Sequence, residues 1–234
     1  MRIRAGVVGF CVALAAIVSA CQPANMTPSA VQPTKSPVAQ RPTPTPVPTP
    51  TPAPALAVEK VGAVATPGGF TAFAVVNNPS GQTAMAVSVQ IAAIGPGGQV
   101  LNRRSGTIAR IGPGHSEAMA LAFPIGRTLP TQFSGSVASV HWSADALAEG
   151  AEVANTSFLQ DARTPSVQVH LVNSGQRAAR VAVTAVCWDG AGNIRGGGSR
   201  TVMVGPDAGG HDVVIEVAIS TVPARCDGYG VTVS

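Results

Sequence analysis

Aromatic and charged side chains are both scarce in this sequence, and their scarcity excludes several kinds of binding surface. Phe, Trp and Tyr make up 4% of the 234 residues, and Asp, Glu, Lys and Arg make up 11%. So few aromatic rings argue against a surface that stacks carbohydrates and against an aromatic groove for peptides. No basic stripe with interleaved aromatic residues is present, so we expect no nucleic-acid partner.

The sequence also lacks the motifs that usually mark a catalytic or metal centre. It contains no G-x-S-x-G, H-E-x-x-H, C-x-x-C or Walker motif. His115 and His211 take equivalent positions after turns, and His141 and His170 fall in predicted strands. We therefore predict no catalytic residue, no cofactor and no metal site. A cell-wall enzyme that uses His141 is the remaining enzymatic alternative.

The first 21 residues have the pattern of an export signal that ends in a lipid-attachment cysteine. Arg2 and Arg4 precede fourteen mostly apolar residues, 5–18, fewer than the roughly 20 that span a bilayer. The order Val18-Ser19-Ala20-Cys21 resembles the lipobox of bacterial lipoproteins, in which the cysteine is diacylated. The resemblance implies a signal peptide over 1–20 and an extracytoplasmic chain anchored to the cell membrane through Cys21. A plain secretory leader followed by a chance cysteine is the alternative.

Residues 21–55 have the composition of a spacer. Eleven of the chain's 20 prolines fall in 22–55, where they alternate with threonine. Proline fixes φ and has no amide proton to donate, so neither helix nor sheet forms. A polyproline II-like chain rises by about 3.1 Å per residue, so this linker would reach about 100 Å when fully extended. We expect a disordered linker that holds a folded part away from a membrane.

The net charge of +4 belongs to these N-terminal segments. Arg2 and Arg4 lie in the leader, and Lys35 and Arg41 lie in the linker. From Leu56 onward the chain has 11 basic and 11 acidic residues. The folded part is therefore neutral as a whole, and the charge balance does not indicate an acidic partner.

The remainder of the chain repeats itself. The segment GQTAMAVSVQI that begins at Gly81 aligns with GQRAARVAVTA, which begins at Gly175, at an offset of 94 residues. Asn78 before the first segment aligns with Asn173 before the second. We therefore predict two copies of one domain, at 56–144 and 150–234, joined by a hinge at 144–150.

Each copy has the periodicity of β-strands. Val87, Val89 and Ile91 alternate with more polar residues in the first copy, as Val181 and Val183 do in the second. Alternation with period two places one face of a strand in a core. Turn signals rich in Gly and Pro recur about every 8–12 residues, which is typical of an antiparallel sandwich or barrel. We predict an all-β fold of two tandem immunoglobulin-like antiparallel β-sandwiches.

Copy two carries a more specific pattern over about 160–218. Leu171-Val172-Asn173 precedes its first turn, Trp188-Asp189 ends the next strand, and Gly192 lies in the following hairpin. This order resembles the FxLYD family of bacterial extracytoplasmic domains, which are immunoglobulin-like sandwiches often carried on lipoproteins. Copy one has Ile94-Gly95 in place of the aromatic–Asp step. The resemblance implies the fold and says little about function, because this fold hosts many roles.

Two cysteines remain after the leader and the lipid site. Cys187 and Cys226 both lie in copy two, and Ala93 takes the position of Cys187 in copy one. An even pair in an exported chain predicts a disulfide. In the chain-entropy model a bridge over this separation stabilises the fold by about 4 kcal/mol. Two free thiols, one of them buried, are the alternative.

Two further local patterns could indicate binding sites, but we interpret both as structural. Asp145, Glu149 and Glu152 cluster near the hinge, where their oxygens could hold Ca²⁺, but a solvated linker is the favoured interpretation. Gly196-Gly197-Gly198 follows a hairpin and does not join a strand to a helix. We predict that these glycines form a loop and do not bind phosphate.

Together these patterns lead to an expectation about function. We expect a non-catalytic, lipid-anchored surface protein whose two domains serve in interaction or spacing. Its expected partners are the membrane, through the acyl chains at Cys21, and an unidentified surface or envelope protein. The alternative is a ligand-capturing accessory lipoprotein of a transporter or sensor.

Overall fold

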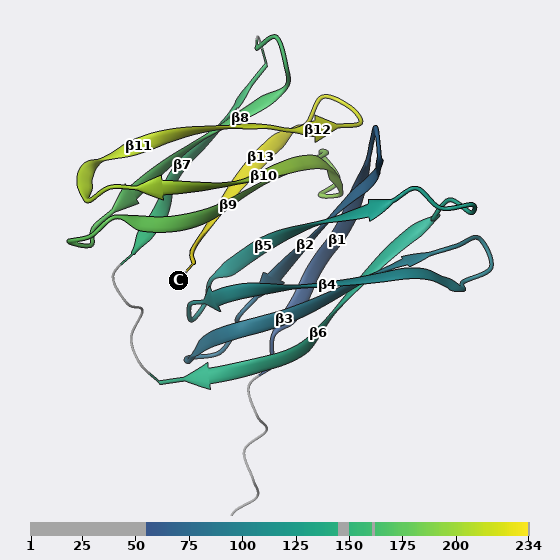
Figure 1. Cartoon of the computed structure of the whole chain (residues 1–234), viewed down its shortest axis with the longest axis horizontal. Coiled ribbons are helices and arrows are strands. Elements are labelled where there is room, and N and C mark those ends of the chain that lie inside the picture. The colour runs from purple at the N-terminus through teal and green to yellow at the C-terminus, as the bar shows by residue number, and fades with distance from the viewer. Residues whose placement is uncertain (1–54, 145–149, 161, 234) are drawn as a thin grey trace, which may run out of the picture. The chain divides into compact units, whose positions relative to one another are not determined.

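The computed structural model describes residues 55–144, 150–160 and 162–233, and every regular element in these residues is a β-strand (Figure 1). All strand pairings are antiparallel. The predicted all-β, sandwich-like fold is therefore confirmed. The signal peptide and nearly all of the linker lie outside the described residues, so these two segments stay predictions.

The first sandwich, residues 57–143, consists of two three-stranded sheets. The first sheet has the order β1-β2-β5 and the second has the order β4-β3-β6. Their strands are β1 (Ala57–Thr66), β2 (Gly69–Asn77), β5 (Ser116–Pro124), β4 (Val100–Ile111), β3 (Thr83–Ile94) and β6 (Gln132–Ser143).

The second sandwich, residues 151–232, repeats this arrangement. Its sheets have the orders β11-β8-β7 and β12-β10-β9-β13. The strands are β11 (Asp207–Glu216), β8 (Ser166–Asn173), β7 (Ala151–Leu159), β12 (Ala218–Ile219), β10 (Ile194–Val204), β9 (Ala179–Trp188) and β13 (Arg225–Thr232). Apart from the short β12, each strand has a counterpart with the same neighbours in the first sandwich. The sequence repeat therefore corresponds to a repeat of topology.

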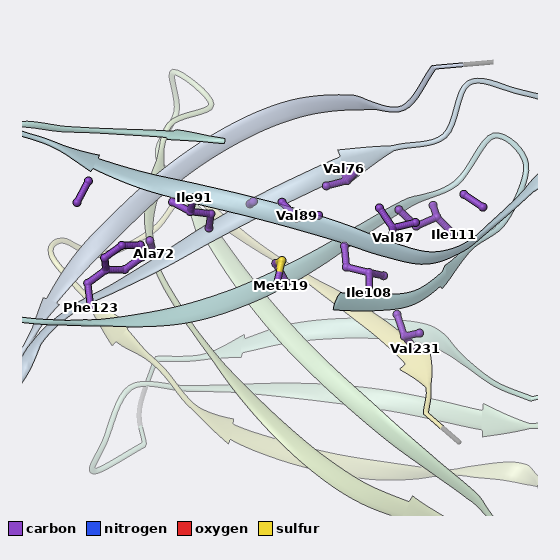
Figure 2. Packing of buried hydrophobic residues seen from close by; sticks show 13 residues of the cluster. Ala72, Val76, Val87, Val89, Ile91, Ile108, Ile111, Met119, Phe123 and Val231 are labelled. Atoms are coloured by element: carbon purple, nitrogen blue, oxygen red, sulfur yellow. The ribbon is translucent and has the colours of Figure 1, made fainter. Parts of the chain in front are cut away.

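The core of the first sandwich follows from the alternation in β3. Val87, Val89 and Ile91 are fully buried, whereas the residues between them are only partly buried. They pack with Met119 and Phe123 of β5 (Figure 2). Burial of such side chains contributes about 1.5–3 kcal/mol each, which makes this cluster the main source of stability in the first sandwich.

A buried asparagine holds the same turn in each sandwich. Asn78 Nδ2 donates to the backbone oxygens of Gln82 and Ile111, at 2.7 and 3.0 Å. Asn173 Nδ2 donates to the backbone oxygens of Arg177 and Val204, at 2.8 and 3.0 Å. Each side-chain oxygen also accepts from a backbone N–H two residues later. The aligned asparagines thus satisfy equivalent buried backbone groups, as an Asx turn does.

The two sandwiches share an apolar cluster. Its buried members are Val64, Phe73, Val75 and Ala118 from the first sandwich, and Val186, Trp188 and Ile194 from the second. Because of this contact β9 is buried on both faces beyond Val183, whereas the alternation predicts one solvent-facing side. That expectation is wrong for the end of β9, since its outer face packs against the other copy.

The predicted loop at Gly196-Gly197-Gly198 is instead part of strand β10. Each glycine allows a different close approach. A Cβ atom at Gly196 would lie 2.1 Å from the Ala218 backbone oxygen, and one at Gly197 would lie 2.8 Å from the Phe73 ring. One at Gly198 would lie 2.2 Å from the Glu216 backbone oxygen. The glycines therefore let β12, the first sandwich and β11 contact this strand.

A second contact between the copies comes from the last strand. Val231 of β13 belongs to the buried cluster of the first sandwich, together with Ile108 of β4 (Figure 2). The two sandwiches belong to one compact unit of the chain, residues 51–234. The division into separable domains at 56–144 and 150–234 therefore stays a prediction, and residues 145–149 of the predicted hinge lie outside the described residues.

The predicted disulfide joins Cys187 and Cys226, with an S–S distance of 2.02 Å. The two residues lie directly opposite each other on β9 and β13. Cys226 is the second residue of the last strand. The bridge therefore links neighbouring strands of one sheet.

Candidate functional site: the cleft between the two sandwiches

A cleft of about 240 Å³ lies where the two sandwiches meet. The first sandwich contributes the ends of β4 and β5 with the turn between them, and the second contributes β7 and β13. Its ionisable lining residues are Arg110, His115, Glu117, Glu152 and Tyr229. The cleft exists because β13 packs across the β4–β5 edge of the first sandwich through Val231.

Glu117 is the most unusual group in this cleft. Its Oε2 atom is buried and has no hydrogen-bond partner among the described residues. Burial raises the pKa of Glu117 to about 8, and the positive charge of Arg110 offsets only part of this rise. Burial disfavours the charged form of a carboxyl group, so the raised pKa favours the protonated form of Glu117 at neutral pH.

Tyr229 lies across the cleft from Glu117, on β13. Burial raises the pKa of its hydroxyl, and the carboxylates of Asp227 and Glu59 raise it further. The Glu59 Oε2 atom itself accepts a hydrogen bond from the Ser116 hydroxyl at 3.3 Å. The cleft thus combines two neutral hydroxyl-bearing groups, Glu117 and Tyr229, with the charged side chains of Arg110 and Glu152. Such a lining suits a small polar molecule better than an apolar one.

The structure tests the predicted disulfide but does not test the predicted lipid site. Cys187 and Cys226 are bonded to each other, so the alternative of two free thiols is wrong. Cys21 lies outside the described residues, and its lipidation stays a prediction.

The four histidines do not gather in one place. His115 lines the cleft, and its backbone oxygen accepts from the Asn78 amide at 2.9 Å. His211 lies on β11 opposite Leu171, and His141 lies on β6 opposite Met85. His170 Nδ1 lies 2.8 Å from Asp212 Oδ1 on the surface. The equivalent turns of the two copies therefore do not bring His115 and His211 together.

Glu152 lines the cleft, whereas Asp145 and Glu149 lie outside the described residues. Within the part of the chain that the structure describes, no group of three or more His, Cys, Asp or Glu side chains is arranged to hold a metal ion. Across the same residues, no helix has the length and hydrophobicity of a membrane span.

Asp189, part of the Trp188-Asp189 step, holds the hairpin between β9 and β10. Its Oδ1 atom accepts from the backbone amides of Ala191 and Asn193, at 2.9 and 2.8 Å. Its Oδ2 atom accepts from Arg195 Nε at 2.8 Å. These bonds, above all the one from the Asn193 backbone, lower the pKa of Asp189 to about 2. The residue has a structural task in the turn.

Sequence reasoning missed Glu117 and the shared apolar cluster. One signal for Glu117 was available, because Glu59 and Glu117 are the only acidic residues in the first copy. One signal for the cluster was the pair Val186 and Trp188, which places large apolar side chains on the face of β9 predicted to meet solvent.

No protein-family model matches the chain, and no curated protein matches its sequence.

Proposed function

We propose that this protein is a non-catalytic, lipid-anchored extracytoplasmic protein whose two immunoglobulin-like sandwiches, of the FxLYD type, act in interaction or spacing. The observation that carries the proposal is the order of segments before β1: an apolar leader, Val18-Ser19-Ala20-Cys21, and a proline-rich linker that ends where the folded part begins. Two acyl chains on a cysteine anchor a protein stably to a bilayer, and one does so only marginally.

The folded part supports the same compartment and the same role. The Cys187–Cys226 bridge suits an oxidising, extracytoplasmic setting. The apolar cluster around Phe73 and Trp188 joins the sandwiches, so they would act as one body at the end of the linker. A single body on a long linker can present a surface at a distance from its anchor.

The anchor is tested by fractionating bacterial cells that express the full chain, Cys21→Ala or Cys11→Ala. We expect the wild type and Cys11→Ala in the membrane fraction, since Cys11 lies in the removed leader, and Cys21→Ala in the soluble fraction. Mass spectrometry should show acyl chains on Cys21. A Cys21→Ala chain that stays in the membrane fraction, or an unmodified Cys21, would contradict the anchor.

A second candidate function, ligand capture, is favoured by the cleft between the sandwiches. Arg110 and Glu152 supply charges of both signs there, which suits a small zwitterion such as a free amino acid. Thermal unfolding would be measured with each common amino acid in turn. A rise in Tm that Arg110→Met abolishes would support ligand capture, and the absence of any rise would contradict it for this ligand class.

A further inference from the structure

The end of the first sandwich farthest from the linker carries exposed apolar side chains. This distal tip consists of three loops, at 67–68, 95–99 and 125–131, with the adjoining start of β4. Thr131 N donates to the Ile94 backbone oxygen at 2.8 Å, and Ile125 N donates to the Gly68 backbone oxygen at 3.2 Å. The loops therefore meet at one end of the sandwich. β1 begins at Ala57, directly after the linker, and runs toward this end (Figure 1).

Three large apolar residues at the tip are open to solvent. Ile125 is 67% exposed, Leu129 is 55% exposed and Val100 is 44% exposed. Pro124 and Pro130 bracket the first two residues and restrict the loop that carries them. The apolar side chains thus stand on short constrained loops, where little chain entropy is lost when they are buried against another surface.

The charges of the first sandwich are segregated along its length. Arg103, Arg104 and Arg127 are exposed and lie at or near the tip. The sandwich has only two acidic residues, Glu59 and Glu117, and both lie at the opposite end, where Ser116 contacts Glu59. Five basic residues against two acidic ones give the first copy a charge of +3, although the folded part as a whole is neutral. The charge balance of the whole chain conceals this basic end.

The second sandwich does not neutralise the tip through the hairpin that approaches β1. Ile194 in this hairpin contacts Gly62. The hairpin's only acidic residue, Asp189, is paired with Arg195 at 2.8 Å. The hairpin therefore adds no net negative charge.

We propose that the distal tip binds the surface of a membrane that contains anionic phospholipids. Exposed apolar side chains enter the boundary between headgroups and acyl chains, while nearby arginines are attracted to anionic headgroups. Each basic residue near such a surface raises affinity by about fivefold. The tip offers both contributions within about 15 Å, since Arg104 follows Val100 by four residues of strand.

The apolar residues stand on loops at the end of a sandwich, so they suit a broad surface better than an inserted peptide. The inference names a partner for the proposed interaction role. Because it concerns the first sandwich alone, it does not depend on acylation of Cys21.

The test uses the full chain with Cys21→Ala, so that no acyl chain contributes and failure of the anchor stays distinguishable from failure of the tip. Vesicles of pure phosphatidylcholine are compared with equimolar phosphatidylcholine and phosphatidylglycerol by co-sedimentation. We expect binding to the phosphatidylglycerol vesicles, weakening as salt rises from about 0.05 to about 0.5 M because charges are screened.

Two tip variants separate the apolar and the basic contributions, and a matched variant controls for surface change. Ile125→Ser with Leu129→Ser removes the apolar contacts, and Arg103→Glu with Arg127→Glu reverses the charge. Each pair should lower affinity at least about tenfold. The control, Met203→Ser with Arg177→Glu, alters exposed residues of the second sandwich and should leave binding unchanged.

Thermal unfolding of each variant checks that it folds. Because the substituted side chains are exposed, we expect no large change in Tm. Equal binding by the tip variants and the control would overturn the proposal, as would equal binding to both kinds of vesicle. Binding to soluble polyglutamate without binding to vesicles would also overturn it, since an acidic protein would then be the better partner.

Discussion

The two sandwiches differ at one pair of equivalent positions on neighbouring strands. In the second sandwich, Cys187 on β9 and Cys226 on β13 lie opposite each other and form a disulfide. In the first, the equivalent positions are Ala93 on β3 and Phe133 on β6. Phe133 packs its ring 5.4 Å from Phe123 and 6.0 Å from Phe70, measured between ring centroids. Phe133 thus joins β6 to β2 and β5 of the facing sheet, whereas the disulfide joins two neighbouring strands of one sheet.

The disulfide and the Phe133 ring therefore stabilise different contacts, one within a sheet and the other between the two sheets of a sandwich. A ring in the first copy acts through burial and edge contacts with other rings, which favours the native state. A disulfide in the second acts mainly by restricting the unfolded chain. The two devices should therefore respond differently to reduction, pH and substitution.

The largest expected effect comes from breaking the disulfide. Cys187→Ala with Cys226→Ala should lower the free energy of unfolding by about 4 kcal/mol, because the 39-residue separation is no longer closed in the unfolded chain. Urea unfolding measures this loss, and reductant should destabilise the wild type but not the double variant. Phe133→Ala in the first sandwich should cost less, about 2 kcal/mol, because this ring is only partly buried, and it should not alter the response to reductant. A double variant as stable as the wild type would show that the Cys187–Cys226 disulfide does not stabilise the fold, and would contradict this prediction.

The next effect concerns Glu117, whose carboxyl group is largely removed from solvent in the first sandwich. The folded-state pKa of Glu117, about 8, lies above its unfolded value of 4.5. Folding therefore retains a proton that the unfolded chain loses, so stability is full below pH 4.5 and falls as the pH rises through 8. Glu117→Gln should remove this alkaline loss and be more stable than the wild type at pH 9, by roughly 2 kcal/mol or more.

Unfolding of the wild type and Glu117→Gln in urea at several pH values measures the effect. Glu152→Gln is the matched control, since it changes a carboxylate of the same cleft that belongs to the second sandwich. Parallel pH profiles for the wild type and Glu117→Gln would show that the carboxyl group at position 117 has the same pKa in the folded and unfolded states, which would contradict its raised pKa.

The buried asparagines provide a smaller comparison between equivalent residues. Asn78 donates to three backbone oxygens, including that of Gly112 at 3.1 Å, whereas two such bonds are present for Asn173. Replacement by alanine leaves these buried acceptors without a partner. We expect a cost of about 2–3 kcal/mol for Asn78→Ala and about 1–2 kcal/mol for Asn173→Ala, measured by urea unfolding. A larger cost at Asn173 would reverse this ranking.

The features that sequence reasoning found are local ones. The alternation of Val87, Val89 and Ile91 predicts β3 because period two is set by strand geometry alone. The sequence alignment of Asn78 with Asn173 agrees with the structure because each asparagine holds a turn within its own copy through equivalent hydrogen bonds. The disulfide is accessible to sequence reasoning because cysteine pairs in exported proteins have few other uses.

The features that sequence reasoning missed arise between distant segments. Val231 enters the core of the first sandwich from the last strand, and nothing in its local pattern marks that destination. From the sequence alone, Gly197 is predicted to lie in a loop. In the structure the Phe73 ring packs so close to Gly197 that a Cβ atom at this position would clash with it. Glu117 has its raised pKa because of burial, and the cleft that it lines includes residues of the second sandwich. Periodicity predicts which face of a strand is buried, and it does not identify the partner.

The smallest expected effect is the acid response of the second sandwich, which has the opposite sign to that of Glu117. Asp189 has its pKa lowered from 3.8 to about 2 by the hydrogen bonds of its hairpin. This stabilisation is present above pH 3.8 and is lost as the pH falls through 2. Asp189→Asn should therefore unfold at the same denaturant concentration at pH 2 as the wild type, and at a slightly lower one at neutral pH. Glu216→Gln, which alters an exposed carboxylate at the end of β11 on the other sheet, is the control. If Asp189→Asn matched the wild type at every pH, the hairpin bonds would contribute nothing to folding, and the Trp188-Asp189 step would need another explanation.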